Sequence, residues 1–169
     1  ANQALFEMVR GDSRLYPFAW VHFPNVNLIE WLTANEEEIR GLKFHPSISQ
    51  VGIYEMKADL PEYLEFADNR RLPFLYHAGR TPISWPDKLM AVARSYPKTK
   101  FIMGHSGGTA YDRAFDTLRR WPTLPENVYA ELSTVRWPDL MVRMVETWGV
   151  DRVRYGSDGS PAGAFGKDP

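Results

Sequence analysis

Residues 74–79 (FLYHAG) and 101–108 (FIMGHSGG) follow one pattern, in which a short apolar run leads to a histidine and then to a glycine two residues later. Short apolar runs of this kind are typical of strands that are buried in a parallel sheet. Residues 86–96, between the two runs, are amphipathic and long enough to form a helix. This order predicts two parallel strands joined by a crossover helix, with both histidines at the same edge of the sheet.

The same alternation extends along the chain in both directions and predicts six strands and six helices in a single domain, residues 1–169. The predicted strands are 18–23, 41–45, 73–77, 100–104, 128–132 and 153–156. The predicted helices are 1–10, 25–35, 60–70, 86–96, 109–120 and 138–148, the second of them capped by Asn25. Strands that are separated by helices run parallel, so the fold class is α/β, either a doubly wound sheet or a barrel.

Polar side chains at the C-terminal ends of the predicted strands favour the barrel. All four histidines of the sequence occupy such positions, namely His22, His45, His77 and His105, and Asp158 follows the last strand. In a parallel barrel these ends converge on one ligand, whereas an open sheet spreads them along a line. A strand-end histidine can also do no more than cap a loop, which is the interpretation that we favour for His22 and leave open for His45.

The composition limits the ligands and partners that we expect. The chain has 20 basic and 21 acidic residues and a net charge of -1, so a small-molecule substrate is expected, and neither nucleic acid nor a membrane surface. The absence of cysteine excludes thiolate zinc sites and leaves any metal to His, Asp, Glu or a modified Lys. No apolar stretch approaches the roughly 20 residues that cross a bilayer, and no signal peptide is recognisable, so we expect a cytoplasmic protein.

Five segments resemble the amidohydrolase superfamily, in particular its branch of barrel-shaped metal-dependent hydrolases and decarboxylases. They are GLKFHP (41–46), FLYHAG (74–79), FIMGHSGG (101–108), NVYAELS (127–133) and RYGSDGS (154–160). The resemblance implies a (β/α)8 barrel of the TIM type in which the six predicted strands correspond to strands three to eight. Strands one and two, and the His-X-His pair that the family carries on strand one, have no counterpart here, so the expected barrel is incomplete. A gene fragment, a truncated protein or a partner chain could each account for this difference.

The resemblance also implies a divalent metal ion, most simply zinc, and a role for each rim residue. His77 would be a metal ligand. Asp158 would be a ligand that also accepts the proton of the attacking water. His105 would be either a second ligand or the catalytic acid or base that polarises the substrate, depending on whether the site holds one ion or two.

Lys43 shares a face of its predicted strand with Gly41 and His45, and this face is expected to be the barrel interior. A lysine there could contact an anionic substrate, form a carbamate that bridges two metal ions, or pair with a rim carboxylate. We expect Lys43, His45 and Arg80 to bind substrate. Arg80 comes shortly after His77, where its guanidinium could bind a substrate carboxylate in a bidentate manner.

One further strand leaves an alternative open. In residues 128–132, and in the serine that follows them, either Glu131 and Ser133 or Ala130 and Leu132 face the interior, and the sequence does not decide which.

Three functions are compatible with these features. The first is a metal-dependent hydrolase of a small cyclic amide, lactone or carboxylate ester. The second is a metal-dependent decarboxylase of the same family. The third is an inactive fragment that is stabilised as a homo-oligomer across exposed sheet edges. The sequence does not identify the substrate.

Overall fold

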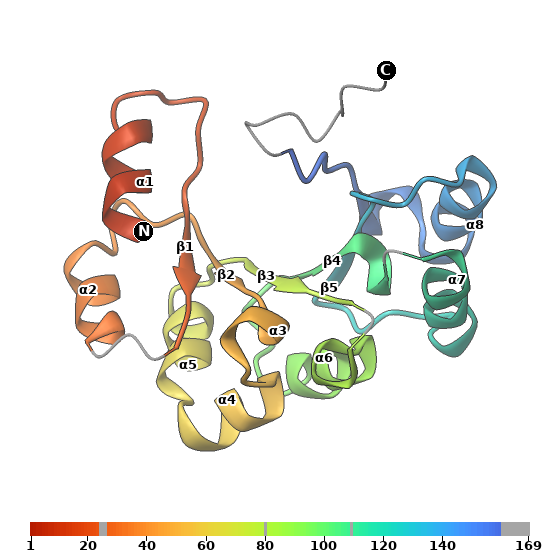
Figure 1. Ribbon diagram of the computed structural model, residues 1–169, viewed down its shortest axis with the longest axis horizontal. Helices are drawn as coiled ribbons and strands as arrows, with labels where there is room; N and C mark the ends of the chain where they lie inside the picture. Colours follow the sequence, from red (N-terminus) through yellow and green to blue (C-terminus); the bar gives the residue numbers. More distant parts are fainter. Residues whose placement is uncertain (24–26, 80, 109, 160–169) are drawn as a thin grey trace.

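The computed structural model describes residues 1–23, 27–79, 81–108 and 110–159, and it contains one sheet of six parallel strands (Figure 1). The strands are β1 (Phe18–Val21), β2 (Gly41–Phe44), β3 (Phe74–His77), β4 (Phe101–Gly104), β5 (Val128–Glu131) and β6 (Val153–Arg154). Each strand pairs with the next strand in the chain, so their order in the sheet is the order of the sequence. A doubly wound sheet reverses its order at a switch point, and this sheet does not. The predicted α/β fold of the barrel type, with six of its strands, is therefore confirmed.

Eight α-helices connect or flank these strands in the described part of the chain. They are α1 (Asn2–Val9), α2 (Leu28–Ala34), α3 (Pro46–Ser49), α4 (Ile53–Asp59), α5 (Glu62–Asn69), α6 (Pro86–Ala93), α7 (Tyr111–Arg120) and α8 (Pro138–Trp148). Six of them lie where the sequence predicts helices, and the predicted cap Asn25 falls outside the described residues. Helices α3 and α4 were not predicted. A helix of four residues, such as α3, is too short to show a helical repeat in the sequence.

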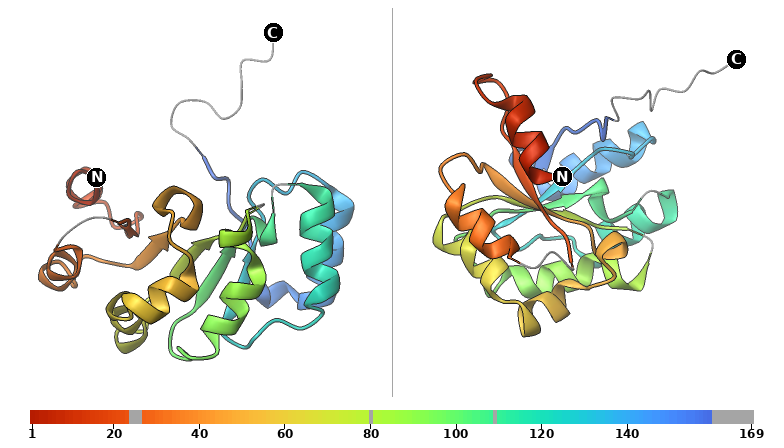
Figure 2. Two further views of the ribbon diagram at one scale, coloured as in Figure 1. Left: turned by 60° about the horizontal axis from the view of Figure 1, so that its bottom comes forward. Right: turned by 60° about the vertical axis from the view of Figure 1, so that its left-hand side comes forward.

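The strands bury one face under the helices and leave the other face concave. Alternate strand residues are completely buried against the helices, namely Ala19, Val21, Leu42, Phe44, Phe74, Tyr76, Phe101, Met103, Val128 and Ala130. Figure 1 shows the helices α2 and α4 to α8 around the outer side of the curved sheet, and the turned views of Figure 2 show the same layer. Because side chains alternate across a strand, Lys43, Leu75 and Ile102 face the concave side instead.

The two end strands have a partner on one side only. Within the described residues β1 pairs only with β2, and β6 pairs only with β5. The sheet is therefore open between β1 and β6. No helix in the part of the chain that the structure describes is long and apolar enough to cross a membrane.

Asn127 ties the end of one β/α unit to the start of the next strand. Its side-chain amide donates to the carbonyl oxygens of Ala93, Tyr96 and Thr99 at 2.9, 2.9 and 3.0 Å. These carbonyls belong to the end of α6 and to the turn between α6 and β4, and Asn127 directly precedes β5. The carbonyls of Ala93 and Tyr96 also accept the backbone N–H groups of Tyr96 and Thr99, so the amide reinforces a turn that already has backbone hydrogen bonds.

We expect Asn127→Ala to lower the free energy of unfolding by about 2 kcal/mol, because it removes several hydrogen bonds that each contribute about 0.5–1.5 kcal/mol. Urea unfolding followed by circular dichroism measures this loss. Asn69→Ala is the matched control, since Asn69 is exposed at the end of α5 and should change stability by less than about 0.5 kcal/mol. Equal effects of the two substitutions would contradict the role of Asn127.

Candidate active site

A cavity of about 430 Å³ opens on the concave side of the sheet. Its lining residues come from the inward faces of the strands and from the loops that follow them. They are Phe18, Lys43, Leu75, Ile102, Gly104, His105, Glu131, Ser133, Arg154, Tyr155, Gly156 and Asp158. Three residues that the sequence singled out, Lys43, His105 and Asp158, therefore share one opening.

His77 and His105 meet at the C-terminal rim of the sheet. His77 is the last residue of β3, and its backbone pairs with Gly104, the last residue of β4, so His105 emerges beside it. The Nδ1 atom of His77 lies 3.0 Å from the Nε2 atom of His105, and the two rings meet edge to face. The parallel register thus brings these two predicted site residues into direct contact.

His45 completes a cluster of three imidazoles with His77 and His105, which we call the imidazole cluster. The His45 ring stacks on the His77 ring with centroids 3.6 Å apart and planes inclined by 15°. The Nδ1 atom of His45 also accepts a hydrogen bond from the backbone N–H of Ile48 at 3.3 Å and so caps α3. His22 lies outside the cluster, with its Nδ1 atom 3.2 Å from the hydroxyl oxygen of Ser49.

The turn that carries His105 is held by Glu131. His105 and Ser106 both adopt the left-handed region, with φ of 60° and 47°, which costs free energy for residues other than glycine. The backbone N–H of His105 donates to Glu131 Oε2 at 3.1 Å, and the hydroxyl of Ser106 donates to the backbone oxygen of Glu131 at 2.9 Å. These bonds fasten the strained turn to the end of β5.

Glu131 and Ser133 are therefore the inward-facing pair, while Ala130 is fully buried on the helix side. Strand alternation alone was compatible with either pair, and only the contact with the neighbouring strand decides between them. Ser133 is 4% exposed, and its hydroxyl oxygen lies 2.9 Å from His105 Nδ1.

Lys43 lies on the concave side, as its alternation with Leu42 predicts. Burial lowers the pKa of Lys43, and the carboxylates of Asp158 and Glu131 partly oppose this effect. No ion pair among the described residues includes Lys43. A cation that is desolvated but has no carboxylate within contact distance favours an anionic ligand.

The remaining predicted residues are not part of the imidazole cluster. Asp158 is exposed and left-handed, with φ of 48°, and it lines the cavity without a hydrogen bond to an imidazole. Burial lowers the pKa of Lys43 and of His45, and the negative charge of Asp158 partly opposes this effect in both. Arg80 lies outside the described residues.

The donors that the structure brings together fit part of a metal site. Two nitrogen ligands of one tetrahedral zinc ion, each at about 2.0–2.1 Å, lie roughly 3.3 Å apart. The 3.0 Å separation of His77 Nδ1 and His105 Nε2 is close to that spacing. Within the described residues, however, no group of three or more His, Cys, Asp or Glu side chains could hold a metal ion. These residues thus offer two ligand positions and do not complete the coordination shell.

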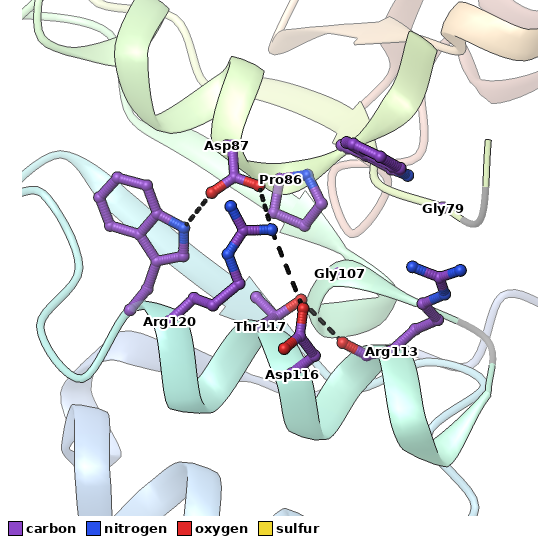
Figure 3. Close-up of a pocket in the computed structure, with 10 residues that line it drawn as sticks. Gly79, Pro86, Asp87, Gly107, Arg113, Asp116, Thr117 and Arg120 are labelled. Carbon is purple, nitrogen blue, oxygen red and sulfur yellow. Dashed lines mark hydrogen bonds and ion pairs between the residues drawn. The ribbon is translucent and has the colours of Figure 1, made fainter. Parts of the chain in front are cut away.

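A second cavity, of about 50 Å³, lies between α6 and α7 (Figure 3). Asp87 accepts the indole N–H of Trp121 at 2.8 Å and pairs with Arg120 at 2.9 Å, while Asp116 lies 3.9 Å from the same guanidinium. Asp87 belongs to α6 and Arg120 to α7, so we interpret the cluster as a joint between the two helices.

This joint also supports the rim turns. Gly79 and Gly107, which follow His77 and His105 by two residues, both line the small cavity (Figure 3). Gly107 has a φ of 92°, and a Cβ atom there would lie 2.3 Å from the hydroxyl oxygen of Thr117. Close packing of the turn on α7 therefore explains why a glycine, Gly107, follows His105 by two residues.

The surroundings of His77 oppose its protonation. Burial is the largest cause, and the nearby His45, His105 and Lys43 add to it, so that the pKa of His77 is lowered to about 3. A neutral imidazole keeps a nitrogen lone pair, which is the form that binds a metal ion.

We expect the ring protons of His77, in protein freed of metal by a chelator, to show no titration between about pH 8 and pH 5 in NMR spectra. The unfolded chain takes up this proton near pH 6.5, so the folded state loses stability as the pH falls from about 6.5 toward 3. The same residue in urea-unfolded protein is the control. A midpoint near pH 6.5 in the folded protein would contradict the burial effect.

Several solved structures show the same fold. An uncharacterised TIM-barrel protein from Bordetella bronchiseptica matches with a TM-score of 0.66 at 12% identity, over 93% of this chain and 59% of its own. The 2,6-dihydroxybenzoate decarboxylase from Rhizobium matches with 0.62 at 18%, over 93% and 64%. An amidohydrolase from Burkholderia multivorans with bound zinc matches with 0.61 at 14%, over 92% and 63%. The chain thus spans between 59% and 64% of the length of these structures.

No curated protein matches the sequence. The model of the amidohydrolase family, by contrast, matches residues 2–161. This range takes in all six strands, the imidazole cluster and the cavity on the concave side. The chain therefore belongs to the amidohydrolase family.

Proposed function

We propose that this chain carries part of the active site of a metal-dependent hydrolase that acts on a small cyclic amide, lactone or carboxylate ester. The observation that carries the proposal is the approach of His77 Nδ1 to His105 Nε2, 3.0 Å apart at the rim of the cavity. Membership of the amidohydrolase family supports it, as does the zinc bound in the Burkholderia multivorans amidohydrolase of the same fold.

His77 and His105 would hold two positions of a divalent ion, most simply zinc, whose remaining ligands are not gathered among the described residues. Such an ion, when bound, lowers the pKa of water toward about 7 and so supplies a nucleophile at neutral pH. Asp158, which lines the same cavity, would accept the proton of the attacking water. If His105 does not bind the ion, its Nε2 lone pair would serve as the base.

Lys43 and His45 would bind the substrate. Lys43 is desolvated and faces the cavity, so its ammonium would attract a carboxylate or another anionic group of the substrate. Because the Nδ1 atom of His45 accepts from the backbone, the neutral ring carries its proton on Nε2 and can donate it to a substrate oxygen. Arg80, three residues after His77 in the sequence, would provide a further contact to a substrate carboxylate.

Decarboxylation is the second candidate, and the position of Lys43 favours it in particular. A partly desolvated cation near the imidazole cluster suits a substrate whose carboxylate is itself the reacting group. The Rhizobium 2,6-dihydroxybenzoate decarboxylase shows that this fold is compatible with such a reaction. Release of carbon dioxide from carboxylated substrates distinguishes this reaction from hydrolysis.

We expect the wild-type chain to bind zinc, and His77→Gln and His105→Gln each to weaken that binding at least about tenfold, because each removes a nitrogen ligand. Competition with a chromogenic chelator measures the affinity. His22→Gln is the matched control, since His22 also follows a strand but contacts Ser49 instead of another imidazole.

Failure of the wild-type chain to take up zinc, or an equal loss in all three variants, would contradict the proposed metal site. Uptake of about one equivalent that depends on His77 and His105 alone supports it.

We expect Lys43→Met to lower kcat/KM for carboxylated substrates about 10- to 100-fold, because a hydrogen bond to a charged group contributes about 1.5–3 kcal/mol. Uncharged ester or lactone analogues should be affected much less. The measurement is product formation over a substrate panel, with carbon dioxide detected in parallel. Lys98→Met, which changes an exposed lysine, is the control. Equal losses on charged and uncharged substrates would exclude Lys43 as the anion contact.

A further inference from the structure

We infer that Glu131 and Ser133 are positioning residues for the imidazole cluster. Acting through the Ser133 hydroxyl, the Glu131 carboxylate fixes the proton of His105 on Nδ1 and leaves the Nε2 lone pair directed at His77. The proton position on His105 follows from the direction of each hydrogen bond. Only the role of the Nε2 lone pair, as metal ligand or base, rests on the proposed function.

The first step is that Glu131 acts as an acceptor in every bond of its side chain. Its Oε2 atom accepts the backbone N–H of His105 at 3.1 Å and the hydroxyl of Ser133 at 2.6 Å. Its Oε1 atom accepts the backbone N–H of Ser133 at 2.6 Å. Backbone N–H groups can only donate, and an ionised carboxylate can only accept, so the single proton of the Ser133 hydroxyl is committed to Glu131.

The second step concerns the two oxygens that face His105 Nδ1. The hydroxyl oxygen of Ser133 lies 2.9 Å from this nitrogen, and the backbone oxygen of Ser133 lies 3.3 Å from it. The hydroxyl already donates its hydrogen bond to Glu131, and a carbonyl oxygen has no proton to donate. Both oxygens therefore accept, so Nδ1 must carry the proton in the neutral ring.

The third step follows for the other nitrogen of the ring. Neutral imidazole holds one proton, so Nε2 of His105 is unprotonated, and across 3.0 Å it accepts a hydrogen bond from His77 Nδ1, whose proton a bound metal ion would replace. His105 is only 4% exposed, so water does not readily replace these partners. The opposite tautomer would turn an unprotonated Nδ1 toward the Ser133 carbonyl and bring two lone pairs together.

The backbone after β6 leaves room for this arrangement. A Cβ atom at Gly156 would lie 1.9 Å from Glu131 Oε1 and 2.7 Å from its carboxyl carbon. The carboxylate therefore occupies the space that any other residue at position 156 would fill. Gly156→Ala should displace Glu131 without removing a single donor or acceptor, which makes it an independent test.

Long-range ¹H–¹⁵N NMR spectra of the metal-free protein report which ring nitrogen of each histidine is protonated. In the wild-type chain we expect a protonated Nδ1 and an unprotonated Nε2 for His105. The reverse assignment would overturn the inference. Because no metal is present, this result does not depend on whether the chain is an enzyme.

Three variants test the route from Glu131 to His105. Ser133→Ala removes the closer acceptor, and Gly156→Ala displaces the carboxylate. Glu131→Gln keeps the shape but turns an amide NH₂ toward a backbone N–H in either orientation. For each variant we expect the ratio of the Nδ1–H to the Nε2–H tautomer of His105 to fall at least about tenfold. Glu126→Gln, at an exposed glutamate just before β5, should leave the ratio unchanged. An unchanged ratio in Ser133→Ala and Glu131→Gln would overturn the positioning role.

Zinc titration separates this inference from the proposed function. We expect Ser133→Ala and Glu131→Gln to weaken zinc binding about 10- to 100-fold, as is usual for partners that orient a ligand. If the wild-type chain shows the expected tautomer but binds no zinc, the metal site fails and the positioning role stands. If zinc binds but the tautomer is reversed, the positioning role fails and the metal site stands.

Discussion

Sequential parallel pairing of the strands is the constraint on which the rest of the structure depends. Each strand bonds to the next strand in the chain, so every C-terminal end reaches the same edge of the sheet. With a residue period of two, one face of each strand is covered by helices, and the other faces the cavity. His77, His105 and Lys43 meet because of this pairing, although no two of them are closer than 28 residues in the sequence.

The rim turn after β4 contains strained backbone that is held in place by hydrogen bonds to its neighbours. Two consecutive left-handed residues, His105 and Ser106, form the turn in which the imidazole contacts His77. Strain of that kind persists only where the surroundings over-determine the conformation. Glu131 holds both residues, one through its carboxylate and one through its backbone oxygen, and Gly107 packs the other side of the turn on α7. The residues that position the imidazole are thus also those that hold its backbone.

Features that depend on local pattern follow from the sequence, and features that depend on contacts between distant elements do not. The strands, their parallel order and the rim positions of His77 and His105 are predicted by short apolar runs and their spacing. The orientation of β5 is not, because alternation permits two answers and only the bond from His105 to Glu131 selects one. Helix α3 is missed because four residues show no helical repeat, and because its cap is the ring of His45, which the sequence suggests only as a substrate contact.

The charges around His77 and His45 oppose protonation of their rings. A carboxylate in direct contact with an imidazole favours the charged ring, whereas burial and a neighbouring cation favour the neutral one. His77 is half-buried beside two other imidazoles and near Lys43, and no carboxylate bonds to it among the described residues. Glu131 reaches the cluster only through the neutral hydroxyl of Ser133 and a backbone N–H. The carboxylate thus sets the direction of the hydrogen bonds from Ser133 and His105. The Ser133 hydroxyl lies between Glu131 and the His105 ring, so the carboxylate does not itself contact the imidazole nitrogens.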